Sequence, residues 1–212
     1  MHWFLNKVIS ITKDSYRAMP FPDFIAFLWS SLFKNERIVI YCRSLQESDN
    51  INLAQNALPI VKGELPDLES GRKLSALHSW EFQCDLYDGV RDFFWYKENG
   101  RIGHISWLYY KGDPNRVLRL TEKECEIKYC LTRPELRGKG LYPAALQQIQ
   151  RYLKKQGYQR CYICVKDDNT PSIRGIEKSG FQPIGSMCLL KAFGVQISRR
   201  RTTSYLSKAV GN

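Results

Sequence analysis

A short loop, Arg137-Gly138-Lys139-Gly140, has the residue types and spacing best suited to bind a ligand. Two glycines separated by one residue let backbone N–H groups approach a ligand closely. The loop precedes a predicted helix, whose N-terminus carries a partial positive charge, and Arg137 and Lys139 add full charges. These groups predict a binding site for a pyrophosphate. The alternative is a basic loop that only caps the helix.

Two better-known phosphate-binding loops do not fit this sequence. The P-loop pattern G-x-x-x-x-G-K-[ST] does not occur in it. The dinucleotide fingerprint G-x-G-x-x-G fails because Pro143 and Ala144 follow Gly140, and because the preceding strands are predicted to form a meander. The predicted anion site therefore belongs to another class of loop.

The elements that must position this loop follow from hydrophobic periodicity and turn residues. Asn99-Gly100 predicts a tight hairpin between strands at 92–97 and 101–110. The elements predicted after the hairpin are, in order, a strand, a helix, a strand, a helix and a strand, at 124–131, 141–156, 160–165, 169–179 and 186–193. This order predicts an α/β fold of the α+β type, a mixed, mostly antiparallel sheet flanked by helices.

Residues 126–181 resemble the acyl-CoA-binding half of the GNAT superfamily of N-acyltransferases. The family pattern is a strand, an R/Q-x-x-G-x-G/A loop and a long helix, then a second strand, an Asn and a helix ending S-I-R-x-x-E-K-x-G-F. Residues 137–140 match the loop, and Asn169 with residues 172–181 matches the later part. The resemblance implies an acyl-CoA-dependent N-acetyltransferase that uses acetyl-CoA as co-substrate and no metal.

The resemblance also implies which residues hold acetyl-CoA. The loop N–H groups would bind the pyrophosphate. The pantetheine arm would lie along strand 128–132, in a splay between it and strand 160–165, and the N–H near Leu131 would stabilise the oxyanion. The implied cofactor-binding residues are Cys130, Leu131, Thr132, Arg137, Gly138, Lys139, Gly140, Leu141, Tyr142, Asn169 and Ser172.

Two positions depart from the family pattern. Tyr142 stands where the loop pattern ends in a small residue. Gly175-Ile176 stands where many relatives carry a tyrosine that protonates the leaving thiolate, and isoleucine cannot donate a proton. Tyr129, Tyr142 or a water could supply that proton. Otherwise the thiolate leaves unassisted, or the chain has lost activity.

The acceptor amine must lose a proton from a group of pKa near 10 before it can attack. Glu126 is the first candidate for the general base, since relatives often carry Glu at this strand position and a carboxylate can act through water. The alternative is an ion-paired or surface residue. His104 is the second candidate, although a lone histidine in a strand is more often structural.

Charge is distributed unevenly along the 212 residues. Residues 1–120 contain 15 basic and 14 acidic side chains, whereas residues 121–212 contain 17 and 7. This asymmetry predicts a bound anion, which could be nucleic acid, an anionic membrane or a phosphorylated ligand. Many of the basic residues lie in or near the strand, loop and helix at 124–160, which favours a CoA-type ligand.

Cysteine usage and hydropathy bear on the compartment. The seven cysteines have irregular spacing and no signal peptide precedes them, which predicts reduced thiols and a cytoplasmic protein. The longest apolar run, at 24–33, is ten residues long and too short to cross a bilayer. Cys161 and Cys164 should point to opposite faces of a strand, which disfavours a metal or redox pair.

The sequence predicts three segments. Residues 57–197 form the acyltransferase domain, residues 1–56 an N-terminal extension with a helix and a strand, and residues 198–212 a basic flexible tail. Arg199–Arg201 in this tail could contact RNA, lipid or an acidic partner, or be solvated.

The expected acceptor is a small-molecule amine or an amino sugar, because no extra recognition module or long charged groove is evident. A protein amine is the other acceptor class, and a second copy of the chain is a candidate partner. The alternatives are a GNAT-like module that binds acyl-CoA or a partner without catalysis, and a nucleic-acid-binding protein, for which no motif is present.

Overall fold

The computed structural model describes residue 22 and residues 34–46, 58–75, 80–115, 117–192 and 195–204. The chain divides into two compact units. One unit covers Ile40–Pro183, and the other combines Met1–Val39 with Ile184–Asn212. Most of the predicted N-terminal extension lies outside the described residues.

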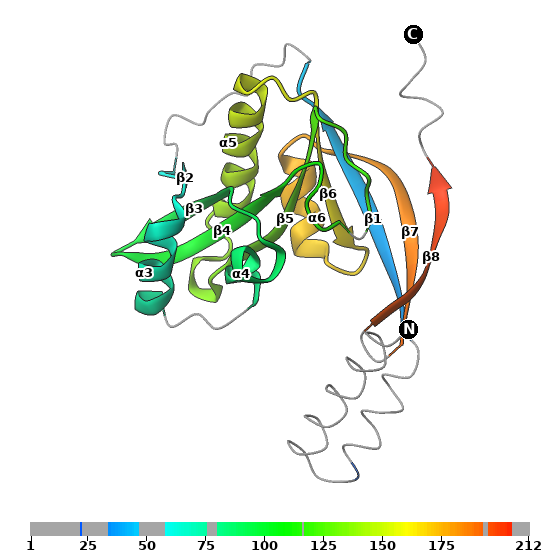
Figure 1. Cartoon of the computed structure of the whole chain (residues 1–212), viewed down its shortest axis with the longest axis horizontal. Coiled ribbons are helices and arrows are strands. Elements are labelled where there is room, and N and C mark those ends of the chain that lie inside the picture. The colour runs from blue at the N-terminus through cyan, green and yellow to red at the C-terminus, as the bar shows by residue number, and fades with distance from the viewer. Residues whose placement is uncertain are drawn as a thin grey trace. The chain divides into compact units, whose positions relative to one another are not determined.

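A mixed sheet forms the centre of the larger unit (Figure 1). Its strands are β2 (Val61–Lys62), β3 (Phe93–Glu98), β4 (Arg101–Tyr109), β5 (Glu124–Thr132) and β6 (Arg160–Lys166). The β2–β3, β3–β4 and β4–β5 pairs are antiparallel, and β5–β6 is parallel. Residues 40–44, the second half of β1 (Lys34–Ser44), lie beside β6. The prediction of a mixed, mostly antiparallel sheet flanked by helices is confirmed.

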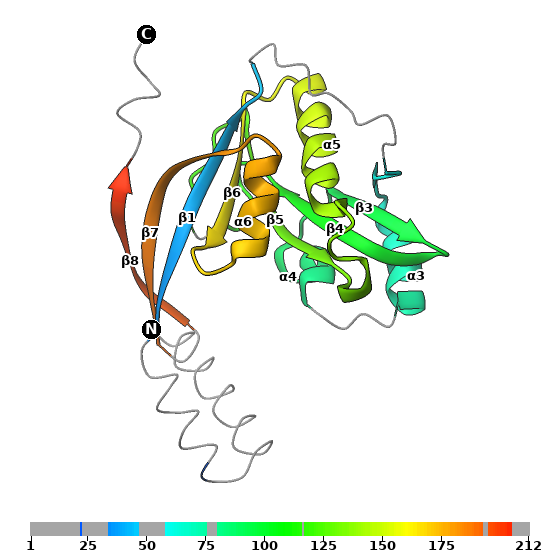
Figure 2. The same ribbon diagram turned by 180° about the vertical axis from the view of Figure 1, so that it is seen from behind.

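Helices cover both faces of this sheet (Figures 1 and 2). The α-helices are α3 (Leu65–Ser75), α4 (Cys84–Asp88), α5 (Leu141–Lys155) and α6 (Thr170–Lys178), and the 3-10 turns are η1 (Trp80–Phe82) and η2 (Pro134–Leu136). α3 and α4 lie on one face, where Leu68, Phe82, Trp95 and Trp107 join a buried apolar cluster. α5 and α6 lie on the other face.

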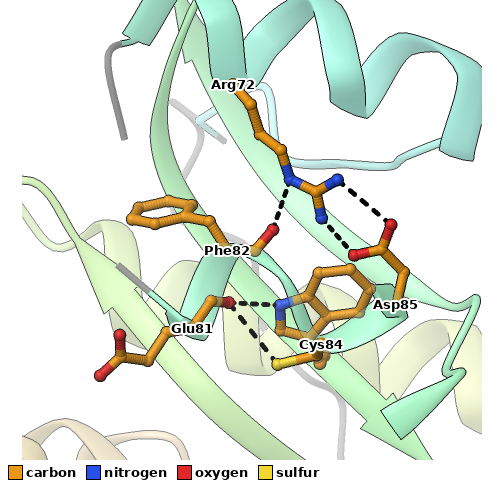
Figure 3. A network of polar contacts seen from close by, with 6 residues as sticks. Arg72, Glu81, Phe82, Cys84 and Asp85 are labelled. Carbon is orange, nitrogen blue, oxygen red and sulfur yellow. Dashed lines mark hydrogen bonds and ion pairs between the residues drawn. The ribbon is translucent and has the colours of Figure 1, made fainter. Parts of the chain in front are cut away.

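A polar network fastens α3, η1 and α4 to each other and to β4 (Figure 3). Arg72 donates to the carbonyl oxygen of Phe82 at 2.6 Å and forms an ion pair with the Asp85 carboxylate. The indole Nε1 of Trp107 donates to the Glu81 carbonyl oxygen at 2.7 Å. The carbonyl oxygens of Glu81 and Phe82 in η1 thus accept hydrogen bonds from side chains of β4 and α3, which holds η1 against the sheet.

The C-terminal region departs from the prediction of a flexible tail from residue 198. β7 (Gln182–Ala192) and β8 (Val195–Ser204) form an antiparallel hairpin in which Cys188 pairs with Arg200. β8 contains β-branched residues, which favour strands, and pairing with β7 satisfies its backbone groups. Arg199–Arg201 therefore lies in a strand, and residues 205–212 lie outside the described part.

Candidate functional site

The loop at 137–140 has a backbone conformation that favours glycine at two of its positions. Gly138 and Gly140 have φ values of 77° and 76°, in the left-handed region that side chains disfavour. A Cβ added at either position would meet no atom within 4 Å. Glycine is therefore favoured at these two positions because of the positive φ, and not because a neighbouring atom would collide with a side chain. The space above them is open, beside the N-terminus of α5, as a phosphate cradle requires.

The loop is held against the ends of β4 and β5. Leu136 is buried beneath it and contacts Gly103, where an added Cβ would lie 2.6 Å from the Leu136 Cδ1. The Arg133 N–H donates to the Gly103 carbonyl at 2.9 Å, and the Arg137 Nε donates to the Thr132 carbonyl at 3.2 Å. The loop is therefore anchored to the sheet.

A bulge distorts β5 just before the loop. Ile105 pairs with Leu131 and Trp107 pairs with Lys128, so β5 uses one more residue than β4 over this stretch. Tyr129 lies within the bulge with φ 50°, which is uncommon for a residue other than glycine. The bulge redirects the side chains that follow it.

β5 and β6 pair only at one end. Their parallel ladder runs from Glu124 and Arg160 to Glu126 and Tyr162, which is three residue pairs. Beyond Glu126 the two strands diverge, in agreement with the splay that the family resemblance implied. The splay opens beside the bulge and leads toward the glycine loop.

Tyr142 reaches into this region from the first turn of α5. Its hydroxyl accepts a hydrogen bond from the Ser172 Oγ at 3.5 Å and interacts with the Cys130 thiol. Its ring lies over Gly175, where an added Cβ would be 2.6 Å from the Tyr142 Cδ1. Burial and the neighbouring Cys130 raise the pKa of Tyr142 well above its usual range. The bulky side chain at the end of the loop is therefore accommodated by a glycine in α6.

His104 is a fully buried structural residue. Its Nδ1 lies 2.7 Å from the Thr132 Oγ1, and its Nε2 lies 2.8 Å from the Ser106 Oγ. Burial lowers the pKa of His104 to about 3, so the ring is neutral and both nitrogens are used. This geometry disfavours His104 as a general base and makes it a support for Thr132.

Glu126 is buried where the β5–β6 ladder ends. Its side chain is 1% exposed, and its Oε2 accepts a hydrogen bond from the Asn115 Nδ2 at 2.5 Å. Burial raises the pKa of Glu126 and outweighs the opposing effects of Lys128, Cys164 and Asn115. A carboxylate with a raised pKa at the edge of a splay is suited to accept a proton near neutral pH.

Tyr129 packs on the other face of the sheet, against the apolar cluster beneath α3 and α4. Its ring meets the Tyr109 ring edge-on, with centroids 5.6 Å apart. The Lys128 ammonium lies 4.1 Å from the centroid of the same Tyr109 ring. The structure therefore separates Tyr129 from the group formed by Cys130, Tyr142 and Ser172.

The start of α6 explains two further predicted residues. The Asn169 side chain accepts from the Ser172 N–H at 3.3 Å and caps the helix. This leaves the Ser172 hydroxyl to contact Tyr142. Ile176, at the position where a tyrosine was expected from the family pattern, is fully buried.

The two cysteines of the Cys161-x-x-Cys164 pair have different neighbours. Cys161 is fully buried and interacts with Cys42, whereas Cys164 interacts with Glu126. Within the described residues, no group of three His, Cys, Asp or Glu side chains is placed to hold a metal ion. A membrane-spanning helix is likewise absent from the described part of the chain.

Sequence reasoning missed several contacts within the site. It did not connect Tyr142 with Gly175, and it did not identify Asn115 and Cys164 as neighbours of Glu126. The two departures from the family pattern were a usable signal, because a large residue gained at one position and a glycine at another suggest a shared space. No comparable signal marked Asn115.

Comparisons with known proteins agree with this geometry. The model of the GNAT acetyltransferase family matches residues 60–181. No curated protein matches the sequence. The chain is similar to a GNAT-family acetyltransferase of Novosphingobium aromaticivorans, with 17% identity, a TM-score of 0.51 and coverage of 74% of this chain and 64% of that chain.

A GNAT-family acetyltransferase from Colwellia psychrerythraea is also similar, with 10% identity, a TM-score of 0.53 and coverage of 83% and 62%. A glucosamine N-acetyltransferase region of a fungal multi-domain β-N-acetylglucosaminidase has 16% identity and a TM-score of 0.54, with coverage of 80% and 22%. The chain thus spans less than two thirds of each of these solved chains. These likenesses show the fold.

Proposed function

Because this chain belongs to the GNAT family of acetyltransferases, we propose that it transfers an acetyl group from acetyl-CoA to the primary amine of a small molecule. The observation that carries the proposal is the open glycine loop, which lies beside a splay with a buried carboxylate at its closed end. Acetyl transfer from CoA needs a site for the pyrophosphate, a channel for the pantetheine arm and a proton acceptor near the thioester. The glycine loop, the splay and the buried carboxylate would serve these three needs, in that order.

The residues present fit a CoA-type ligand. Gly138 and Gly140 leave open space next to the start of α5, and Lys139 is exposed within the same loop. The backbone of Cys130, Leu131 and Thr132 would follow the pantetheine arm along the diverging part of β5. Acetyl-CoA supplies the activated acetyl group, and the backbone N–H near Leu131 would stabilise the oxyanion.

Glu126 is the proposed general base. An acceptor reaches the enzyme as an ammonium ion, so a proton must leave before nitrogen can attack. The raised pKa of Glu126, caused by burial, makes its carboxylate a stronger base than an exposed Glu. Since Glu126 is 1% exposed, it would act through a water in the splay.

The proposed acceptor is a small amine or an amino sugar, with a protein amine as the competing class. The alternative function is an acyl-CoA-binding module without catalysis, which is favoured by the buried Ile176 in place of a tyrosine. Turnover separates this alternative from the enzyme, because a module would bind acetyl-CoA and release no CoA.

The test is a screen for acetyl-CoA turnover over amines, amino sugars and peptides, with Glu126→Gln beside the parent chain. The variant should lower kcat/KM by about 10²- to 10⁴-fold and still bind acetyl-CoA. Glu122→Gln is the matched control, because Glu122 is exposed and pairs with Lys111 away from the site. A Glu126→Gln rate equal to that of the parent at every pH would remove Glu126 as the base.

A further inference from the structure

We propose that Asn115 is a positioning residue that holds the Glu126 carboxylate in one orientation and in its ionised form. This inference rests on the proposed function, in which Glu126 is the general base, and deepens it by assigning the group that prepares the base. The side-chain amide of Asn115 neither gives nor takes a proton. It acts through Glu126 and is not itself a catalytic residue.

The orientation of the Asn115 amide is fixed within its own loop. Its Oδ1 accepts hydrogen bonds from the backbone N–H groups of Val117, at 3.3 Å, and Leu118, at 3.2 Å. Asn side chains commonly bond the backbone a few residues ahead in this way, in an Asx turn. With Oδ1 so used, Nδ2 lies toward Glu126 and donates to its Oε2 at 2.5 Å. Because the NH₂ group of an amide can only donate, the Glu126 oxygen accepts.

The loop that carries Asn115 is tied to β5 and closed by its own hydrogen bonds. The Lys128 Nζ, on β5, donates to the Pro114 carbonyl oxygen at 3.3 Å. The Asp113 N–H donates to the Tyr110 carbonyl oxygen at 3.2 Å, and the Asp113 carboxylate accepts from the Tyr110 N–H at 2.7 Å. The residue before Asn115 is therefore held against the strand that contains the base.

A donor to the carboxylate offsets part of the cost of burying it. The Glu126 side chain is 1% exposed, and such burial favours the neutral form of a carboxyl group. The hydrogen bond from Asn115 favours the ionised form, because the donor stabilises negative charge. Burial is the larger effect and raises the pKa of Glu126, against the opposing effects of Lys128 and Asn115. The bond therefore limits how far the pKa rises, and a base must be ionised at the working pH.

Other titratable groups lie on the elements around Glu126, which are β4, β5, β6, η1 and α4. These groups are Tyr109, Cys125, Lys128, Cys164, Glu81 and Asp88. Burial raises the pKa of the tyrosine and of both thiols, so these three stay neutral near neutral pH. The charged members are the same in the parent chain and in variants of Asn115. A difference between their titrations therefore reports the loss of the Asn115 hydrogen bond.

The pKa of Glu126 in the unliganded chain tests the hydrogen bond without any acceptor. Carbon-13 NMR of protein labelled at the glutamate carboxyl carbons measures it, and the Glu126 signal is the one absent from Glu126→Gln. Asn115→Asp keeps an oxygen for the turn and replaces the donor by a second carboxyl group. The two carboxyls would titrate as a coupled pair, and the more buried Glu126 should keep the shared proton. Its titration midpoint should rise by about one unit or more.

Asn115→Ser is a second variant, which adds no charge. A serine hydroxyl can still accept from the backbone in such a turn, but its side chain is too short to replace the amide donor to Glu126. The Glu126 midpoint should rise by less than in Asn115→Asp, since only the donor is lost. Asn99→Asp is the matched control, because Asn99 is exposed in the β3–β4 turn, at the opposite end of β4 from Tyr109, the partner of Glu126. It makes the same charge change and should leave the midpoint unchanged.

The pH profile of turnover tests the consequence for the base. With an acceptor found in the screen, the acidic limb of kcat/KM should move to higher pH in Asn115→Asp by the same amount as the midpoint. Below that limb the variant should be slower by about tenfold for each unit of the shift, and at high pH the two rates should converge. A merely structural role would lower the rate by one factor at every pH or raise KM alone, and either result would overturn the inference.

The two measurements separate this inference from the proposed function. If the Glu126 midpoint is the same in the parent chain and in both Asn115 variants, Asn115 does not hold the carboxylate, and the inference fails even if the chain is a transferase. If the midpoint shifts but the parent chain releases no CoA with any acceptor, the proposed function fails, and Asn115 has no base to position. A shifted midpoint together with a shifted acidic limb supports both.

Discussion

Gly140→Asp should abolish the stabilisation of the protein by acetyl-CoA. The residue has φ 76°, and an added Cβ would meet nothing within 4 Å, so the folded chain faces backbone strain but no overlap. The strain costs about 1 kcal/mol for a non-glycine residue in the left-handed region. For a chain of 212 residues this lowers Tm by about 2–4 °C.

The effect on binding should be much larger than the effect on folding. At a ligand concentration about 100 times Kd, acetyl-CoA stabilises the parent chain by about 2.7 kcal/mol. This corresponds to a rise in Tm of roughly 5–11 °C at this size. In the variant a carboxylate would face the pyrophosphate across the cradle, and the rise should disappear.

Differential scanning fluorimetry with and without acetyl-CoA measures both quantities. Gly112→Asp is the matched control, because Gly112 also has a positive φ, of 96°, and open space around it, in a turn away from the loop. The control should lose a similar amount of Tm and keep the full ligand-induced rise. A normal rise in Gly140→Asp would refute the assignment of this loop as the pyrophosphate site.

Three further outcomes follow from the described contacts. Burial raises the pKa of Glu126 in the folded state, so the protonated carboxyl contributes to stability below the usual pKa of roughly 4.3, and this contribution is lost as pH rises through the raised pKa. Denaturant titrations over this pH window should therefore show a smaller loss of unfolding free energy in Glu126→Gln than in the parent chain. Asp85→Asn should lower the free energy of unfolding by about 1–3 kcal/mol, measured in urea, because it weakens the partner of the largely buried Arg72; an unchanged midpoint would contradict this. Gly103→Ala should cost about 1–3 kcal/mol by overlap with Leu136, and a Tm equal to that of the parent would show that Leu136 can move.

Local signals in the sequence predicted the parts of the fold that depend on neighbouring residues. Asn99 and Gly100 both have positive φ values in the turn between β3 and β4, which their types anticipate. The same kind of reasoning predicted that a helix begins at Leu141, where α5 begins. In each case the requirement is set by a few consecutive residues.

Contacts between segments that are distant in the sequence could not be predicted from such local signals. Tyr142 and Gly175 share a space only because α5 and α6 lie on the same face of the sheet. Asn115 reaches Glu126 from a loop whose path depends on the hairpin around it. The part of β8 (Val195–Ser204) from residue 198 onward was expected to belong to a flexible tail, because its basic residues gave no local sign of its pairing with β7.

The short ladder between β5 and β6 places an open backbone edge inside the sheet. Strand edges at the rim of a sheet invite another chain to pair and aggregate. The edge that opens beyond Glu126 and Tyr162 is instead flanked along the sheet by β4 and by the second half of β1, and α5 and α6 cover one face. Hydrogen exchange should therefore find β5 amides beyond Glu126 that are less protected than those at the ladder, and a bound extended ligand should slow their exchange.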